Sequence, residues 1–192
     1  MKIMQHALLI LAMKIIWLAT ASAQPTIYVV RHAEALETWP ADSLPDNKPL
    51  SAEGINRSLK LAQQFKVRSL SAIYSSRTTR ATNSALPLAR KLGLSVKFAD
   101  ACTDTSLTTI SAFFRQLERN HGDSDSVLIV THSNVIPQLL IAAGLPPECY
   151  KRMGFTKSAS YPGWLIEGYD TIWKIRWGNR NRDCKGLEQR KY

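Results

Sequence analysis

Residues 26–34, TIYVVRHAE, decide the fold that we expect for this chain. Apolar or β-favouring residues run without polar alternation into Arg31, His32 and Glu34, a pattern typical of a strand buried on both faces of an α/β sheet. Side chains directly after such a strand lie in the crevice at its carboxyl end, where open α/β sheets bind ligands. Arg31 can neutralise an anion there, and His32 offers a nitrogen nucleophile that titrates near neutral pH.

The alternation of strands and helices continues along the chain. Further strands are predicted at 72–74, 94–98 and 127–130, and apolar residues recur at helical spacing in 55–65, 81–92, 107–117 and 135–143. We expect Ile55, Leu59 and Ala62 to share an apolar stripe, which Leu61 and Phe65 widen. Gly93 should end the second helix as a C-cap. The pattern predicts an α/β three-layer sandwich, with a largely parallel central sheet flanked by helices.

The ends of the domain are less regular. Residues 35–50 carry three prolines and read as a surface loop long enough to cover a site. Residues 161–166 and 171–177 are predicted to pair around Glu167-Gly168 as a C-terminal hairpin at the edge of the sheet. The basic residues near the end of the sequence are expected to be solvated, and they are Arg180, Arg182, Lys185, Arg190 and Lys191.

Length and charge bound the function only loosely. The sequence has 192 residues, of which 45% are hydrophobic and 21% are charged, as in a folded protein with one domain over residues 24–192. The formal net charge is +10. Such a surface attracts phosphorylated small molecules, nucleic acid or anionic membranes, and charge alone does not choose among them.

Residues 1–23 have the pattern of a secretory signal peptide. Lys2 precedes an apolar stretch, and Ala21-Ser22-Ala23 forms a small-x-small cleavage site before Gln24. Lys14 interrupts the apolar stretch, which argues against a stable membrane span. We expect a periplasmic or secreted protein cleaved after Ala23, with an uncleaved anchor as the alternative.

The cysteines do not resemble a metal site. Cys102, Cys149 and Cys184 follow the leader, so one disulfide would leave one thiol over, and sequence does not give the pairing. Free cysteines packed in the core are the favoured interpretation. No metal and no cofactor is expected.

Charged and polar side chains follow several of the predicted strands. Because parallel strands end at the same edge of a sheet, we expect these side chains to converge. They are Arg31 and His32 after the first strand, Arg80 after the second, Asp100 and Asp104 after the third, and His132 after the fourth. So much positive character in one crevice predicts an anionic ligand, and a phosphoryl group is the natural one.

These groups suit phosphoryl transfer through a covalent intermediate. A neutral His32 imidazole attacks phosphorus in line, and water then hydrolyses the phosphohistidine. Arg31, Arg80 and His132 stabilise the charge on the equatorial oxygens, helped by backbone amides near Ser76. The leaving group needs a proton, for which Asp104 is favoured over Asp100. In the alternative interpretation, either aspartate is an ordinary loop residue that caps the third helix.

Three segments resemble the signatures of the histidine phosphatase superfamily, also called phosphoglycerate-mutase-like. They are Arg31-His32-Ala33-Glu34, the stretch from Ser76 to Ala85 with Arg80, and Val130-Thr131-His132-Ser133-Asn134. The resemblance implies a phosphohistidine at His32, with Arg31, Arg80 and His132 completing a phosphate pocket and Ser76 close to it. Arg77-Thr78-Thr79 and Asn83-Ser84 depart from the commoner residues, and no clear motif places the proton donor.

The leader and the short length resemble the small exported branch of that family. The predicted function is therefore an exported, metal-independent phosphomonoesterase of the histidine acid phosphatase type, acting on a small or lipid-linked, envelope-associated phosphate ester. A catalytically weak phosphate- or polyanion-binding module is one alternative. A phosphosugar mutase is another, although the leader speaks against its cytosolic home. No nucleic-acid partner is expected, peripheral contact with an anionic envelope is compatible with the charge, and the sequence does not determine the oligomeric state.

Overall fold

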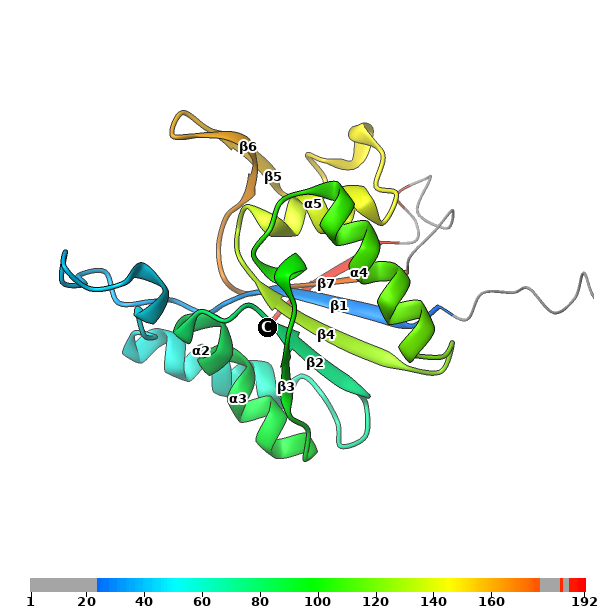
Figure 1. Cartoon of the computed structure of the whole chain (residues 1–192), viewed down its shortest axis with the longest axis horizontal. Helices are drawn as coiled ribbons and strands as arrows, with labels where there is room; N and C mark the ends of the chain where they lie inside the picture. The colour runs from blue at the N-terminus through cyan, green and yellow to red at the C-terminus, as the bar shows by residue number, and fades with distance from the viewer. Residues whose placement is uncertain (1–23, 177–183, 185–186) are drawn as a thin grey trace, which may run out of the picture.

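A computed structural model describes residues 24–176, 184 and 187–192 (Figure 1). The predicted signal peptide, residues 1–23, lies outside the described residues, as do Trp177, Arg180, Arg182 and Lys185. Within the described ranges, no helix is both long enough and apolar enough to cross a membrane.

Strands and helices alternate through the first two thirds of the chain, as predicted. The strands are β1 Thr26–Arg31, β2 Ala72–Ser75, β3 Val96–Phe98, β4 Ser126–Thr131, β5 Phe155–Ser158, β6 Tyr161–Ile166, β7 Thr171–Arg176 and β8 Glu188–Lys191. The α-helices are α2 Ala52–Gln63, α3 Thr79–Leu92, α4 Leu107–Asn120 and α5 Val135–Ala142. The short 3-10 helices are η1 Pro45–Asn47, η2 Asp100–Cys102 and η3 Pro147–Cys149.

The central sheet has the strand order β3-β2-β4-β1-β7-β8. β1, β2, β3 and β4 are parallel, with β4 inserted between β1 and β2, whereas β7 and β8 are antiparallel additions at one side. Arg31 at the end of β1 is in register with Thr131 at the end of β4. The residues that follow these two strands are therefore neighbours in space.

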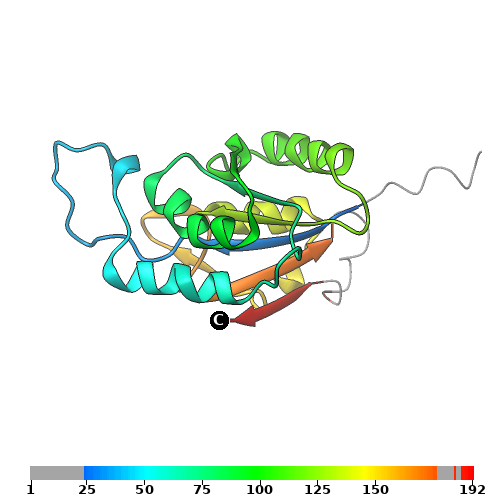
Figure 2. The same ribbon diagram turned by 90° about the horizontal axis from the view of Figure 1, so that it is seen from below.

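Helices cover both faces of the sheet, so the predicted three-layer sandwich is confirmed. α2 and α3 lie on one face and α4 and α5 on the other (Figure 1). Val29, Leu128 and Ile129 of the two central strands are completely buried, as a strand covered on both sides requires. Figure 2 shows the loop 35–50 projecting from the carboxyl end of β1.

The start of α2 is packed tightly against the segment that follows His32. The Ser51 hydroxyl accepts a hydrogen bond from the Gly54 amide at 3.1 Å and so caps the helix. The Ser51 amide donates to the Glu34 carbonyl at 2.9 Å. A side chain at Gly54 would collide with that same carbonyl oxygen, so only glycine permits the contact.

One predicted strand pairing is wrong. Residues 161–166 and 171–176 do form strands, but they do not pair with each other. β6 pairs with β5 in a separate two-stranded antiparallel sheet, whereas β7 joins the central sheet beside β1. The turn Glu167-Gly168 is compatible with either arrangement, and the deciding factor is that Trp173 and Ile175 of β7 are buried in the main core.

The predicted apolar stripe of α2 is confirmed in part. Leu61, Ala62 and Phe65 are buried as predicted, whereas Ile55 and Leu59 are about half exposed, at 53% and 50%. The close contact at Gly54 sets the rotation of the helix, because Gly54 must lie against the Glu34 carbonyl. At the other end of this layer, Gly93 ends α3 in the left-handed conformation with φ 68°, as predicted.

The expectation of free cysteines is wrong for two of the three. Cys149 and Cys184 form a disulfide, and the buried Cys102 remains free. Arg190 and Lys191 are exposed, as predicted, although they lie in β8, which pairs with β7 along the edge of the sheet. Cys149 and Cys184 are 35 residues apart, and spacing alone does not show that the fold brings them together.

Candidate active site

The two histidines of the predicted site lie side by side. His32 follows β1 and His132 follows β4, and their ring centroids are 5.1 Å apart. Both side chains are buried, with 7% and 9% of their surface exposed. The parallel pairing of β1 with β4 brings them together, as we expected from the sequence.

The His32 ring is held in one orientation by its own backbone. Its Nδ1 is 2.7 Å from the Ala33 carbonyl oxygen. Because a carbonyl oxygen can only accept a hydrogen bond, Nδ1 carries the proton in this contact. The other nitrogen, Nε2, is then left with a free lone pair, which a nucleophile requires.

Both imidazoles are uncharged at neutral pH. Burial lowers the pKa of His32 to about 3, and the positive charges of Arg80 and Arg31 act in the same direction. Burial, followed by the charge of Arg80, lowers the pKa of His132 to about 4. The expectation that His32 titrates near neutral pH is therefore corrected, since an imidazolium is disfavoured in a buried site beside two guanidinium groups.

Arg31 is held by the turn between β6 and β7. Its Nη1 donates to the Gly168 carbonyl at 3.1 Å, its Nη2 donates to the Tyr169 hydroxyl at 3.1 Å, and its guanidinium lies 3.8 Å from the centre of the Tyr169 ring. Its Nε is buried and has no hydrogen-bond partner among the described residues. A buried donor without a partner is costly, so this N–H is suited to an oxygen of a bound anion.

Arg80 approaches the same place from the first turn of α3. Its Nη1 donates to the carbonyl of Pro45 at 3.0 Å, so the projecting loop reaches the site as predicted. Arg80 lowers the pKa of Arg31, His32 and His132, which shows that its charge acts on all three. Arginine keeps its charge in such surroundings, so two cations face two neutral imidazoles.

Ser76 contacts His132 directly. The Ser76 hydroxyl is 2.9 Å from His132 Nε2 and 3.0 Å from the Thr78 hydroxyl, and both hydroxyl-bearing residues are buried. Thr78 is the N-cap of α3 and accepts from the Ala81 amide. The start of the helix that carries Arg80 is thus tied to His132.

A second link joins α3 to the segment after His32. The Ala33 amide donates to the Ser84 hydroxyl at 2.8 Å, and that hydroxyl donates to the Arg80 carbonyl at 2.7 Å. Ser84 is one of the residues that depart from the pattern of the resembled family, and here it holds the segment after His32 against α3. His32, Arg31, Arg80, His132 and Ser76 are therefore brought together as predicted.

Comparison with known proteins agrees with this geometry. The family description "Histidine phosphatase superfamily (branch 1)" matches residues 27–109, which include Arg31, His32 and Arg80. Residues 27–109 are thus similar to the histidine phosphatase superfamily. No curated protein sequence matches the chain significantly.

Several solved structures share the fold of this chain. The protein histidine phosphatase SixA, complexed with tungstate, is 17% identical, with a TM-score of 0.58 over 86% of this chain and 96% of that chain. A mycobacterial glucosyl-3-phosphoglycerate phosphatase is 15% identical, with a TM-score of 0.57 over 88% of this chain and 97% of that chain. At these identities the comparison shows the common fold and nothing finer.

The predicted proton donor would have to lie near the two histidines. A cavity of about 360 Å³ is lined by the η1, α3 and η2 segments, including Asp46, Arg77, Thr78, Asp100 and Asp104. Both predicted acid candidates therefore line one cavity, and Asp46, whose charge raises the pKa of Arg80 and His132, joins them there.

Asp104 is partly exposed, and its carboxyl is ionised at neutral pH. Hydrogen bonds from the Thr109 side chain and the Ser106 amide lower the pKa of its carboxyl. These contacts resemble those of a loop aspartate beside the start of α4, which was the alternative interpretation. An acid catalyst must hold a proton, so the lowered pKa weighs against Asp104, and the donor remains a prediction.

Sequence reasoning missed three contributors to the site, Tyr169, Asp46 and Ser84. Tyr169 lies in the turn before β7. An antiparallel strand begins where its parallel neighbours end, so this turn lies at the edge that carries His32. A prediction that paired β7 with β1 would have placed Tyr169 at this edge. The hairpin that we predicted instead gave no reason to place Tyr169 near His32. Among the described residues, no group of three His, Cys, Asp or Glu side chains is arranged to hold a metal ion.

Proposed function

We propose that the protein is a phosphomonoesterase that acts through a phosphohistidine on His32. The observation that carries the proposal is the contact of His32 Nδ1 with the Ala33 carbonyl, which fixes the proton on Nδ1 in a ring that burial keeps uncharged. A nucleophile positioned in this way does not have to lose a proton first. Arg31 and Arg80 supply the positive charge that a phosphoryl group requires.

The first step transfers the phosphoryl group to the protein. The lone pair of His32 Nε2 forms a bond to phosphorus while the bond from phosphorus to the leaving oxygen breaks, and that oxygen takes a proton from a carboxylic acid. The unpartnered Nε of Arg31 and the guanidinium of Arg80 bind the equatorial oxygens. The incoming dianion favours protonation of His132, which then donates to another oxygen.

The second step releases phosphate. Water attacks phosphorus opposite Nε2, the nitrogen–phosphorus bond breaks, and the proton of the water passes to the carboxylate that donated in the first step. The candidates for this carboxylate line the 360 Å³ cavity, where we expect the leaving group to lie. Of the two predicted donors, Asp104 and Asp100, the lowered pKa of Asp104 makes it the weaker.

The alternative is a phosphate-binding module without turnover, because the same pocket would bind an anion without a working acid. Hydrolysis of an aryl phosphate by residues 24–192 separates the two, since its leaving group needs little protonation. We expect turnover by the wild type, none by His32→Ala, and acid-labile phosphate on His32 after a rapid acid quench. Phosphate binding without turnover above the His32→Ala background would favour the module.

The cavity also guides the search for the substrate. Its lining combines three carboxylates with Arg77 and threonine hydroxyls, so leaving groups that carry hydroxyl or amino groups are favoured over those that carry a second phosphate. A panel of phosphosugars, phosphorylated amines, lipid phosphates and phosphopeptides tests this preference. Neighbouring structures described with tungstate and with VO3 support an oxyanion pocket in this fold.

We also propose that the reaction needs no metal and that the protein is exported. In the described site the charge on the phosphoryl group can be balanced by arginines, and activity should persist in a chelator. The Cys149–Cys184 disulfide supports an oxidising compartment, such as the periplasm or the cell exterior. Expression with residues 1–23 in a bacterial host should yield a mature form that begins at Gln24. Retention of the leader on a membrane-bound product would instead support the uncleaved anchor.

A further inference from the structure

The position of Arg31 depends on a single distant turn. Its contacts with the Gly168 carbonyl, the Tyr169 hydroxyl and the Tyr169 ring all come from residues 167–170, more than 130 positions along the chain. Arginine has many accessible rotamers, and an unsupported guanidinium would lose conformational entropy on binding phosphate. Whatever fixes this turn therefore prepares Arg31 for the substrate.

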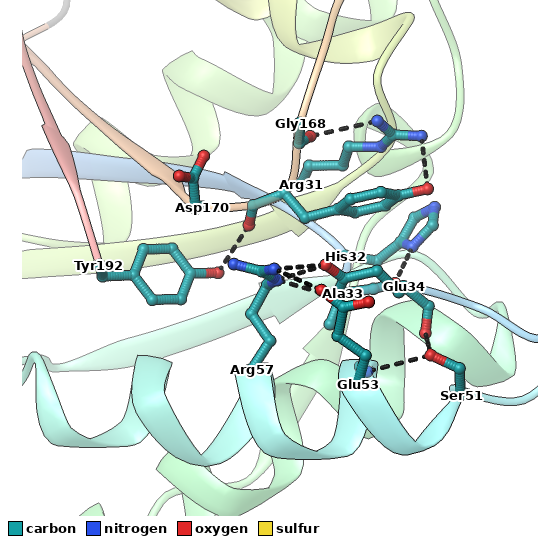
Figure 3. A network of polar contacts seen from close by, with 12 residues as sticks. Arg31, His32, Ala33, Glu34, Ser51, Glu53, Arg57, Gly168, Asp170 and Tyr192 are labelled. Carbon is teal, nitrogen blue, oxygen red and sulfur yellow. Dashed lines mark hydrogen bonds and ion pairs between the residues drawn. The ribbon is translucent and has the colours of Figure 1, made fainter.

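Tyr192 and its neighbour Lys191 fix the turn. The Tyr192 hydroxyl donates to the Tyr169 carbonyl at 3.0 Å, and the Tyr192 amide donates to the Asp170 carbonyl at 2.9 Å. The Lys191 ammonium forms an ion pair with the Asp170 carboxylate at 2.6 Å. Figure 3 shows Tyr192 reaching the turn that carries Gly168 and Asp170, with Arg31 on the other side of that turn.

Tyr192 lies close to the ion pair between Arg57 and Glu34. Arg57 on α2 binds the Glu34 carboxylate through Nε at 2.6 and 2.8 Å, and its charge acts on Tyr192 (Figure 3). Burial raises the pKa of Tyr192, so the hydroxyl keeps its proton and can donate at neutral pH. Glu34 lies two residues after His32, so one network borders both the nucleophile and the turn that holds Arg31.

We propose that Tyr192 is a positioning residue of the phosphate pocket, which acts through the Tyr169 carbonyl and the turn 167–170 on Arg31. The proposal rests on the proposed function in that it assigns Arg31 to the phosphoryl group. Tyr192 itself does not touch the substrate. The proposed mechanism does not otherwise use β8 or the residue that follows it.

The first test is Tyr192→Phe, which keeps the ring and removes the hydrogen bond. We expect the dissociation constant for inorganic phosphate, measured by calorimetry on residues 24–192, to rise about 3- to 10-fold, and kcat/KM for an aryl phosphate to fall by the same factor. Two matched variants should leave both quantities unchanged. Tyr150→Phe makes the same chemical change in a ring that packs against Phe155 and Trp164. Lys174→Met breaks the exposed Lys174–Glu188 pair between β7 and β8.

The second test is a double-mutant cycle with Arg31→Ala. If Tyr192 acts through Arg31, Tyr192→Phe has no further effect on phosphate affinity or on kcat/KM in that background. Full additivity, or wild-type phosphate affinity in a folded Tyr192→Phe variant, would overturn the proposal. The phosphate-affinity arm does not need turnover, so it tests Tyr192 even if the wild type hydrolyses nothing. If the wild type shows no turnover but the phosphate affinities of the double-mutant cycle are non-additive as expected, only the proposed function is contradicted.

Discussion

The parallel edge of the sheet and the segments after residue 143 contribute to the pocket in different ways. The parallel edge supplies the groups that we propose to contact phosphorus or its oxygens, namely His32, Arg31, Arg80 and His132. The later segments supply supports, including Tyr169 and Tyr192 and the disulfide that joins η3 to the stretch before β8. The comparison indicates that the proposed reacting groups are placed by the ends of parallel strands. The orientation of these groups depends on residues that are distant in sequence. The following experiments test whether this division holds.

The largest effect is expected from the nucleophile. His32→Ala should lower kcat/KM for an aryl phosphate by at least about 10⁴-fold, because no other group can form the covalent intermediate. The matched control is His121→Ala, which removes another buried histidine whose ring contacts Tyr74 and Ser71 away from the pocket. Comparable losses in both variants, measured below their melting temperatures, would mean that the parallel edge does not supply the reacting group.

Arg80→Ala is expected to have the next largest effect. Removing one charged donor to the phosphoryl oxygens should lower kcat by about 10²- to 10³-fold, as deletion of an oxyanion-hole donor does in other enzymes. Arg90→Ala, an exposed residue on the same helix, should change kcat less than about 2-fold. A small effect at Arg80 would show that Arg31 and His132 are sufficient.

Loss of the disulfide should affect stability more than chemistry. The double variant Cys149→Ser/Cys184→Ser opens a loop of 35 residues and should lower the free energy of unfolding by about 3 kcal/mol. Denaturant unfolding measures this loss, with the single substitution Cys102→Ala as a control at the buried free thiol. Activity of the folded fraction should fall far less than in Arg80→Ala. A loss of activity as large as that of Arg80→Ala would show that the disulfide is needed for catalysis as well as for stability.

Because His32 and His132 are buried and uncharged, the free energy of unfolding is expected to fall in acid. The pKa of His32 is about 3 in the folded protein and about 6.5 when unfolded, so the unfolded state binds the extra proton between these values. Stability is therefore fully present above about pH 6.5 and is lost as the pH falls toward 3. Between pH 7 and 5 the wild type should lose about 1–2 kcal/mol more than His32→Asn. Parallel stability curves would contradict the buried, neutral state of this ring.

The smallest effect is expected from Asp104. Because hydrogen bonds lower the pKa of its carboxyl, Asp104→Asn should lower hydrolysis of an alkyl phosphate by less than about 3-fold. The same substitution at Asp100 and at Asp46 provides the comparison, and the donor is the residue whose loss reduces alkyl hydrolysis while sparing aryl hydrolysis. Selective loss in Asp104→Asn would restore Asp104 as the acid despite its ionisation in the free protein.

The sequence by itself determined the parallel sheet and the convergence of the side chains to which we assign the chemistry. Runs of buried residues at 26–31 and 126–131, each followed by a histidine, require only that parallel strands end at one edge, so His32 and His132 could be placed together without coordinates. Arg80 and Ser76 follow from the same rule. These inferences depend on short-range pattern and topology, which sequence carries strongly.

Only the tertiary structure decided what supports and tunes those groups. The rotation of α2 follows from the contact of Gly54 with Glu34, and the pairing of β7 with β1 rather than with β6 brings Tyr169 beside Arg31. The neutral state of His32 follows from burial beside two guanidinium groups, which pattern does not report. The physical reason is common to all three. Packing, pairing and desolvation depend on residues far apart in the chain, and no local spacing encodes them.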